Sequence, residues 1–257
     1  MRLWPLRSST FLDRDDEEWQ LETWRWLLER LGGLGDLTRS PFIVPSRAFF
    51  PPTDAVGDER VAHVFESVKR HSRMPDYECR LMAQPKRPEA QVAPFTILKP
   101  VEGHLPLGTF RVDGNGALIT YDPEMVDQPV KLIATLAHEL AHYRLNLLGE
   151  LPPGGEANLE FATDLTTVYL GFGLFGASSA FQFQQHGDAF SQGWRWSRQG
   201  YLAEREWLFA LAVFFQLRGE AVDAAKLYLK PAQFKDLSRA AAYLRRQADF
   251  VALHATS

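Results

Sequence analysis

The sequence lacks most of the features that would place it in a familiar binding class. Cys79 is the single cysteine among 257 residues, so the chain can form no internal disulfide and offers no Cys-x-x-Cys pair to a metal ion. This cysteine usage fits a reducing compartment. Long runs of Lys or Arg are also missing, and the formal net charge is −4. Both facts argue against nucleic acid or an anionic membrane as the main partner.

Long uninterrupted apolar segments are missing as well. The two most apolar windows are residues 165–181, which are broken by Thr and Gly, and residues 208–217, which are too short to cross a bilayer. The first residues hold too short an apolar stretch for a signal peptide, and charged residues follow at once. The sequence therefore predicts a soluble, cytoplasmic protein.

The remaining composition is that of a globular protein with a sizeable core, because 46% of the residues are hydrophobic and 23% are charged. The apolar, β-branched pieces between residues 77 and 121 predict strands, and the Asn-Gly pair within 113–116 predicts a β-hairpin. Hydrophobic periodicity predicts helices over residues 13–31, 58–70, 129–148, 156–175, 201–218, 220–229 and 232–249. The predicted fold class is α+β, with a small β-sheet between helical segments.

The most informative stretch is ATLAHELAHYRL, residues 134–145, inside the predicted helix 129–148. The apolar positions of this helix recur at spacings of three and four, which is typical of a buried stripe. The predicted stripe consists of Ile133, Leu136, Leu140, Tyr143 and Leu147. His138 and His142 lie on the opposite side of the helix, one turn apart. They therefore project from a face that the core does not use, where they are available as ligands.

The spacing of these histidines suits one metal ion. Side chains four residues apart on a helix have Cβ atoms about 5–6 Å apart, and zinc–nitrogen bonds are about 2.0–2.1 Å long. His138 and His142 can therefore bind the same Zn²⁺. Glu139 points about a quarter turn away, where it can reach a water on the metal. This H-E-x-x-H arrangement supplies two ligands and a general base.

The next predicted helix carries two carboxylates, Glu160 and Asp164, again four residues apart on one face. The rest of this helix is largely apolar, and an unpaired buried charge is expensive. The carboxylates therefore need a partner. A metal ion and its ligand histidine would supply one.

These residues together resemble a known family. HELAH at 138–142, followed after 17 residues by EFATD at 160–164, is similar to the pattern of the gluzincin, or thermolysin-like, zinc metallopeptidases. The resemblance covers about residues 108–176. It implies a zincin-like domain with a small β-sheet, an active-site helix and a second ligand helix, flanked by helical segments. It also implies that the strand 117–121 is an edge strand that binds an extended substrate.

The resemblance assigns a role to each residue of the pattern. It implies that His138, His142 and Glu160 bind Zn²⁺, that Glu139 is the general base, and that Asp164 orients the first ligand histidine. The implied activity is that of a zinc-dependent hydrolase, a peptidase that cleaves an amide bond of a peptide or protein substrate. Glu139 would take a proton from an activated water and pass it to the leaving amine.

Several features of the pattern exclude neighbouring classes. Leu145 and Leu148 stand where a metzincin would have glycine and a third histidine. The Gly-x-Met-Glu-Asn element of gluzincin aminopeptidases is absent, so nothing supports an exopeptidase. Peptide deformylases need a cysteine ligand upstream, and Cys79 lacks their surrounding motif. Glu156, one turn before Glu160, is the rival third ligand; Glu160 is favoured because only it has the downstream Asp partner.

Some assignments stay open. A donor that stabilises the reaction's tetrahedral intermediate could be Tyr201, His186, Arg144 or Arg205. An alternative function is a regulatory or binding protein that keeps the scaffold and captures a dedicated protein partner. A third possibility has no metal, with the polar pairs joining two helices as salt bridges.

The expected organisation has three segments. They are an N-terminal helical and irregular segment packed on the core (1–90), a zincin-like catalytic core (91–180) and a C-terminal helical subdomain (181–257).

Overall fold

The structure, a computed structural model, describes residues 10–85, 107–114, 116–178 and 201–247. Its helices are α1 (Arg14–Leu31), α2 (Gly33–Leu37), α3 (Gly57–His71), α4 (Pro129–Asn146), α5 (Leu159–Tyr169), α7 (Glu204–Leu217) and α8 (Pro231–Leu244). Residues 173–178 are also helical. Short 3₁₀ turns are η1 (Pro123–Met125), η2 (Gly155–Asn158) and η4 (Val222–Ala225). With the strands β1 (Cys79–Ala83), β2 (Gly108–Asp113) and β3 (Gly116–Tyr121), these elements confirm the predicted α+β fold class.

The strands form a small mixed sheet in the order β1-β3-β2. β2 and β3 make the predicted antiparallel hairpin, in which Asp113 pairs with Gly116. β1 runs parallel to β3, with Cys79 opposite Ala117. The central position of β3 overturns one expectation, because residues 117–121 do not form an edge strand. β2 takes an edge of this sheet instead.

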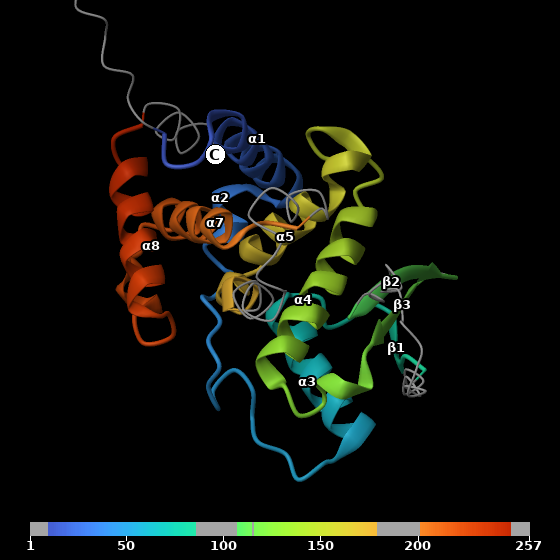
Figure 1. The fold of residues 1–257 in the computed structure, drawn as a ribbon. Coiled ribbons are helices and arrows are strands. Elements are labelled where there is room, and N and C mark those ends of the chain that lie inside the picture. The colour runs from blue at the N-terminus through green and yellow to red at the C-terminus, as the bar shows by residue number, and fades with distance from the viewer. Residues whose placement is uncertain (1–9, 86–106, 115, 179–200, 248–257) are drawn as a thin grey trace, which may run out of the picture.

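Helix α4 links the sheet to the rest of the molecule. Pro129 occupies the first turn of this helix, where its missing N–H costs no hydrogen bond and its fixed φ suits the helix. α4 contacts β2 and β3 on one side and α3 and α5 on others, while α5 in turn contacts α1 and α7. Figure 1 shows the resulting arrangement, with the sheet on one flank, α4 next to it, and α7 and α8 on the far flank.

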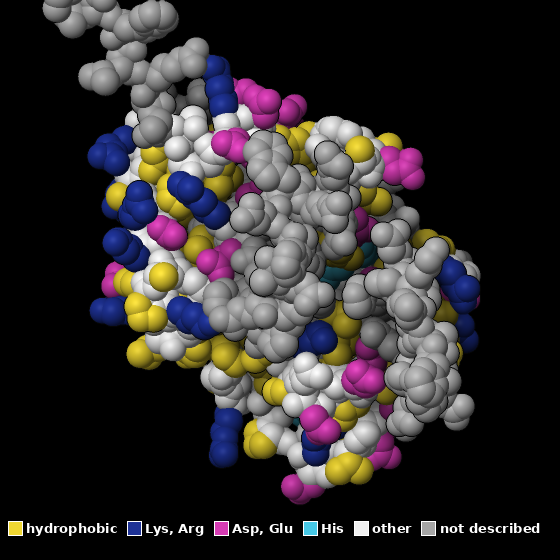
Figure 2. Space-filling model, viewed as in Figure 1, with side chains coloured by type: hydrophobic (Ala, Val, Ile, Leu, Met, Phe, Trp, Pro, Cys, Tyr) yellow, Lys and Arg dark blue, Asp and Glu magenta, His cyan; other side chains and the backbone are white. Residues whose placement is uncertain are grey.

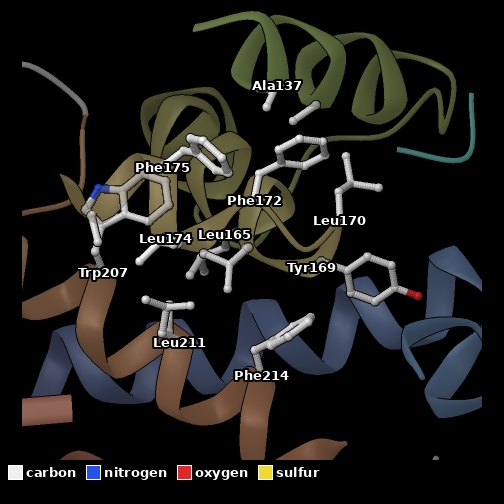
Figure 3. Close-up of a cluster of buried hydrophobic side chains, with 14 of the residues drawn as sticks. Ala137, Leu165, Tyr169, Leu170, Phe172, Leu174, Phe175, Trp207, Leu211 and Phe214 are labelled. Carbon is white, nitrogen blue, oxygen red and sulfur yellow. The ribbon is translucent and has the colours of Figure 1, made fainter. Parts of the chain in front are cut away.

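One hydrophobic core extends from Phe11, before α1, to Leu244, at the end of α8. Figure 3 shows one part of this core, where Trp207, Leu211 and Phe214 of α7 point toward aromatic and aliphatic side chains of residues 165–175. Trp207 lies so close to Gly176 that a side chain at that position would meet its indole ring. The indole ring of Trp207 packs directly against the backbone of Gly176, which explains why a glycine stands there.

The predicted buried stripe of α4 is correct except at its end. Ile133, Leu136, Leu140 and Tyr143 are buried, but Leu147 is 54% exposed. Leu147 is the C-cap residue of α4, one position beyond the last residue of the helix.

Two helix predictions need correction. The predicted helix 156–175 is divided, because α5 ends at Tyr169 and Gly171 adopts a φ of +97°. Ile43 donates its backbone N–H to the carbonyl oxygen of Gly171, which fixes this break. The predicted helix 220–229 is reduced to the 3₁₀ turn η4. The other predicted helices end within a few residues of the observed bounds, α8 stopping at Leu244.

Within the described ranges, no helix has both the length and the apolar character that crossing a membrane would require.

Candidate metal centre

Helices α4 and α5 bring together three side chains that can share a metal ion. One possible ligand atom from each of His138, His142 and Glu160 lies within 4.8 Å of the others. Glu160 Oε2 is 3.2 Å from His138 Nε2 and 3.3 Å from His142 Nε2. The two imidazole rings are 4.7 Å apart and almost perpendicular. Two imidazole nitrogens and a carboxylate are a ligand set of catalytic zinc sites.

The alternative third ligand lies elsewhere. Glu156 is exposed in the turn η2, before α5 begins. Among the described residues, no other group of three His, Cys, Asp or Glu side chains comes as close together as the cluster that contains Glu160. The helical phase of α5 explains the difference, since Glu160 stands in its first turn and faces α4.

Asp164 holds the first histidine of the cluster. His138 Nδ1 donates a hydrogen bond of 2.9 Å to Asp164 Oδ1, and this leaves His138 Nε2 directed toward Glu160. The second carboxylate oxygen, Asp164 Oδ2, accepts the backbone N–H of Leu202 at 2.9 Å. Asp164 is only 3% exposed. A buried carboxylate with both oxygens occupied is a rigid anchor for an imidazole ring.

The histidines and the carboxylates of the cluster stabilise one another's charged forms. Burial lowers the pKa of His138, but hydrogen bonds to Asp164 and Glu160 outweigh it and raise the pKa to about 10. Burial works against ionisation of Glu160, yet its hydrogen bonds with His138 and His142 hold the pKa of this carboxyl well below its ordinary value. The site therefore holds an ionised carboxylate beside a histidine that attracts a positive charge. A metal cation can replace the proton on that histidine.

Glu139 is placed differently from the ligand candidates. It is 5% exposed, and it lies against β2, where a Cβ atom added to Gly108 would come within 2.8 Å of Glu139 Oε1 and 2.6 Å of Thr135 Cγ2. Burial raises the pKa of Glu139, while the neighbouring His138 and His142 lower it. The net result is a pKa above the ordinary value of a glutamate, which makes this carboxylate a stronger proton acceptor.

The edge strand β2 runs beside this carboxylate. The hairpin places Thr109 opposite Thr120 and Phe110 opposite Ile119, and Asp122 donates its backbone N–H to Leu107 just beyond the strand. Antiparallel pairs alternate between hydrogen-bonded and non-hydrogen-bonded positions. Since Leu107 and Asp122 form a hydrogen-bonded pair, Phe110, three residues along, belongs to a non-hydrogen-bonded pair. The backbone N–H and C=O groups of Phe110, and of the residues two positions before and after it, therefore point away from β3, toward the open side of the described sheet.

The candidate donors for an oxyanion have different surroundings. Tyr201 is 46% exposed, and its ring centroid lies 5.6 Å from that of His138. Arg144 instead donates to the hydroxyl of Tyr77, and Arg205 lies over the ring of Phe11. His186 lies outside the described residues. Of the four candidates, the structure thus places Tyr201 beside the cluster.

Tyr201 keeps its proton in this setting. Burial, followed by the negative charges of Glu160 and Asp164, raises the pKa of Tyr201 to about 12. Its phenol is therefore a hydrogen-bond donor at neutral pH.

Some contacts at the site have no clear signal in the sequence. Gly108 leaves room for Glu139, the backbone N–H of Leu202 reaches Asp164, and Thr163 meets His142, with 3.2 Å between Thr163 Oγ1 and His142 Nδ1. Thr163 alone could have been noticed, because it precedes Asp164 and lies three residues after Glu160 on the same helix. Figure 2 shows histidine surface in a hollow on one face of the molecule, with acidic side chains near it.

Comparisons with known proteins returned no relative: no family model, no curated protein and no solved structure matches this chain.

Proposed function

We propose that this chain is a zinc-dependent metallohydrolase with a zincin-like core, and that it cleaves amide bonds in peptides. The observation that carries the proposal is the convergence of His138, His142 and Glu160 within 4.8 Å, with the buried carboxylate of Glu139 on the helix that carries the two histidines. A purely structural metal site would have no need of Glu139.

The donor set fits zinc. Imidazole nitrogens and a carboxylate oxygen suit Zn²⁺, and three protein ligands leave a position open for reactants. Asp164 would orient His138 from behind. When bound, zinc would supply a Lewis acid that polarises a carbonyl group and lowers the pKa of water.

Glu139 and Tyr201 would transfer protons and stabilise the negative charge that develops on the substrate. Glu139, held between α4 and β2, would accept a proton from the attacking water and deliver it to the leaving nitrogen. Gly108 would keep room for that carboxylate to move between the two positions. Tyr201 would donate its phenol proton as a hydrogen bond to the oxygen on which negative charge develops.

The edge of the sheet supports a peptide as substrate. β2 offers outward-facing backbone groups beside Glu139, and an extended peptide can add to such an edge as a further strand. Backbone hydrogen bonds of this kind would place a scissile amide next to the cluster without selecting a particular side chain.

A Glu139→Gln variant tests the proposal. We expect it to bind about one zinc ion per chain, as the parent does, while cleavage of a mixed-sequence peptide library, followed by mass spectrometry, falls at least about 100-fold. Glu156→Gln is the matched control, since it alters an exposed carboxylate outside the cluster, and it should cleave normally.

Two results would contradict the proposal. Full activity in Glu139→Gln would remove the assigned base. A zinc-loaded parent that cleaves no peptide of the library would favour the regulatory or binding alternative.

A further inference from the structure

The hydroxyl of Thr163 has two partners in the interior of the protein. Thr163 is fully buried, and its Oγ1 atom lies 2.8 Å from the carbonyl oxygen of Leu159 and 3.2 Å from Nδ1 of His142. Leu159 is one helical turn earlier on α5, whereas His142 comes from α4. The hydroxyl therefore connects the second candidate zinc ligand to the helix that carries the third.

The position of each proton follows from these distances. A carbonyl oxygen has no proton to give, so a contact of 2.8 Å between two oxygens requires that Thr163 donate its hydroxyl proton to Leu159. That hydroxyl has a single proton. Thr163 Oγ1 can then meet His142 Nδ1 only as an acceptor, so Nδ1 of His142 carries a proton. The lone pair of the neutral ring is left on Nε2, the nitrogen that faces Glu160.

The ring of His142 is also held on its face. Phe110 of β2 lies almost parallel to it, with ring centroids 6.2 Å apart and an angle of 10°. The hydrogen bond to Thr163 and the stacked ring of Phe110 restrain different motions, since the first restrains rotation of the imidazole in its plane and the second restrains its tilt.

We propose that Thr163 is a positioning residue that fixes the tautomer and orientation of His142, as Asp164 does for His138. This inference rests on the zinc site of the proposed function, but it does not rest on peptide cleavage. Two consecutive residues of α5 would then serve the two histidines of α4, one through a hydroxyl and one through a carboxylate. The first adds no charge beside the metal site, and the second adds one.

The same helix provides an internal control. Thr167 is also buried, and its hydroxyl donates to the carbonyl oxygen of Thr163, one turn earlier, at 3.0 Å. Replacing Thr167 by Val removes a buried hydroxyl and the same kind of helical hydrogen bond, but leaves the contact with His142 intact. Any effect specific to Thr163→Val then arises from His142.

The first experiment measures zinc affinity by competition with a chelator, with zinc alone as the probe. Loss of a group that orients a ligand histidine typically weakens metal binding 10–100-fold. We expect that loss in Thr163→Val, a change of less than about threefold in Thr163→Ser, which keeps the acceptor, and no change in Thr167→Val. Equal zinc affinity in Thr163→Val and the parent would overturn the proposal.

The second experiment is decided on the parent protein, so its outcome does not depend on a variant that might fold poorly. In the zinc-loaded parent, nitrogen-15 NMR of histidine side chains should show a proton on Nδ1 of His142 that exchanges slowly with water, because Thr163 accepts it. The Thr163→Val protein should show fast exchange, and Thr167→Val should match the parent. A parent in which Nδ1 of His142 lacks a proton would contradict the assignment, whether or not the protein cleaves peptides.

Discussion

Helix α5 separates two interfaces of opposite character. On the side toward α7, Val168 lies near Leu211, and both side chains are buried. On the side toward α4, the same helix presents Glu160, Thr163 and Asp164 to the two histidines. Only a few residues of one short helix therefore separate a close-packed apolar contact from a cluster of hydrogen-bonded polar groups.

The difference indicates how stability and chemistry are divided in this molecule. Apolar surface removed from water contributes about 25 cal/mol per Å², and this term holds α5 against α7. Polar groups gain little net stability when buried, because hydrogen bonding mainly offsets their lost hydration. The α4 side of α5 should therefore determine metal binding, whereas the α7 side should determine whether the chain stays folded.

Truncation on the apolar side should have the largest effect on folding. Leu211→Ala leaves a cavity beside Val168 and Gly173, and we expect the free energy of unfolding to fall by about 2–5 kcal/mol in urea titrations. The folded fraction should still bind zinc as tightly as the parent.

Leu227→Ala is the control for that change. Leu227 is 90% exposed, so its truncation should alter stability by no more than about 0.5 kcal/mol. If folded Leu211→Ala instead loses zinc affinity as strongly as a variant of the polar side, the two interfaces are not separable.

A change on the polar side should show the reverse pattern. Asp164→Asn removes the negative charge that holds His138 and leaves the shape of the side chain unchanged. We expect zinc affinity to fall about 10–100-fold, with a smaller loss of stability in the metal-free protein than Leu211→Ala causes. Chelator competition measures the zinc affinity, and urea unfolding of the same samples without metal measures the free energy of unfolding. An Asp164→Asn protein that unfolds more easily than Leu211→Ala would reverse the assignment.

The smallest expected effect on stability comes from Glu206, at the start of α7, where the chain passes from the contact with Asp164 into the apolar interface. Glu206 accepts the backbone N–H of Ala203 at 2.6 Å, just after Leu202 contacts Asp164. Burial raises the pKa of Glu206 from 4.5 to about 7, although the hydrogen bond from Ala203 opposes it. Asp16, Asp164 and Asp13 add to the rise. The folded protein therefore holds a proton on Glu206 that the unfolded chain releases at lower pH.

The sign of the pH effect follows from that difference. The stabilising contribution of the protonated Glu206 is fully present below about pH 4.5 and is lost as the pH rises through about 7. Glu206→Gln should abolish this slope and gain about 1–2 kcal/mol over the parent at pH 8, measured by urea unfolding across the pH range. Glu204→Gln, a control in the same helical turn, should keep the slope of the parent.

The sequence was a good guide to local structure and to the histidine pair. The apolar period placed α4 and the burial of Leu136 and Leu140, and the Asp-Gly-Asn-Gly stretch 113–116 placed the hairpin, because these signals depend on neighbouring residues only. The Asn-Gly pair itself is not the turn, since Gly116 already pairs with Asp113 in the ladder. The same period placed Glu160 and Asp164 on the face that meets α4.

What the sequence missed depends on contacts between distant segments. The parallel pairing of β1 with β3 joins residues more than 35 apart, and it turned the expected edge strand into the central one. The break after α5 needs Ile43 to meet Gly171, and the role of Thr163 needs the ring of His142 from another helix. A pattern of neighbouring residues carries no information about such long-range contacts. The assignment of zinc and of the peptidase activity stays a prediction.

The metal content of the purified protein tests the central claim most directly. Elemental analysis of protein prepared without a histidine tag should find about one zinc per chain, and His142→Ala and Glu160→Ala should each lose it while staying folded. A parent protein that takes up no zinc even when the metal is supplied would contradict the account. Two helices joined by histidine–carboxylate pairs would then explain the HELAH motif without any metal.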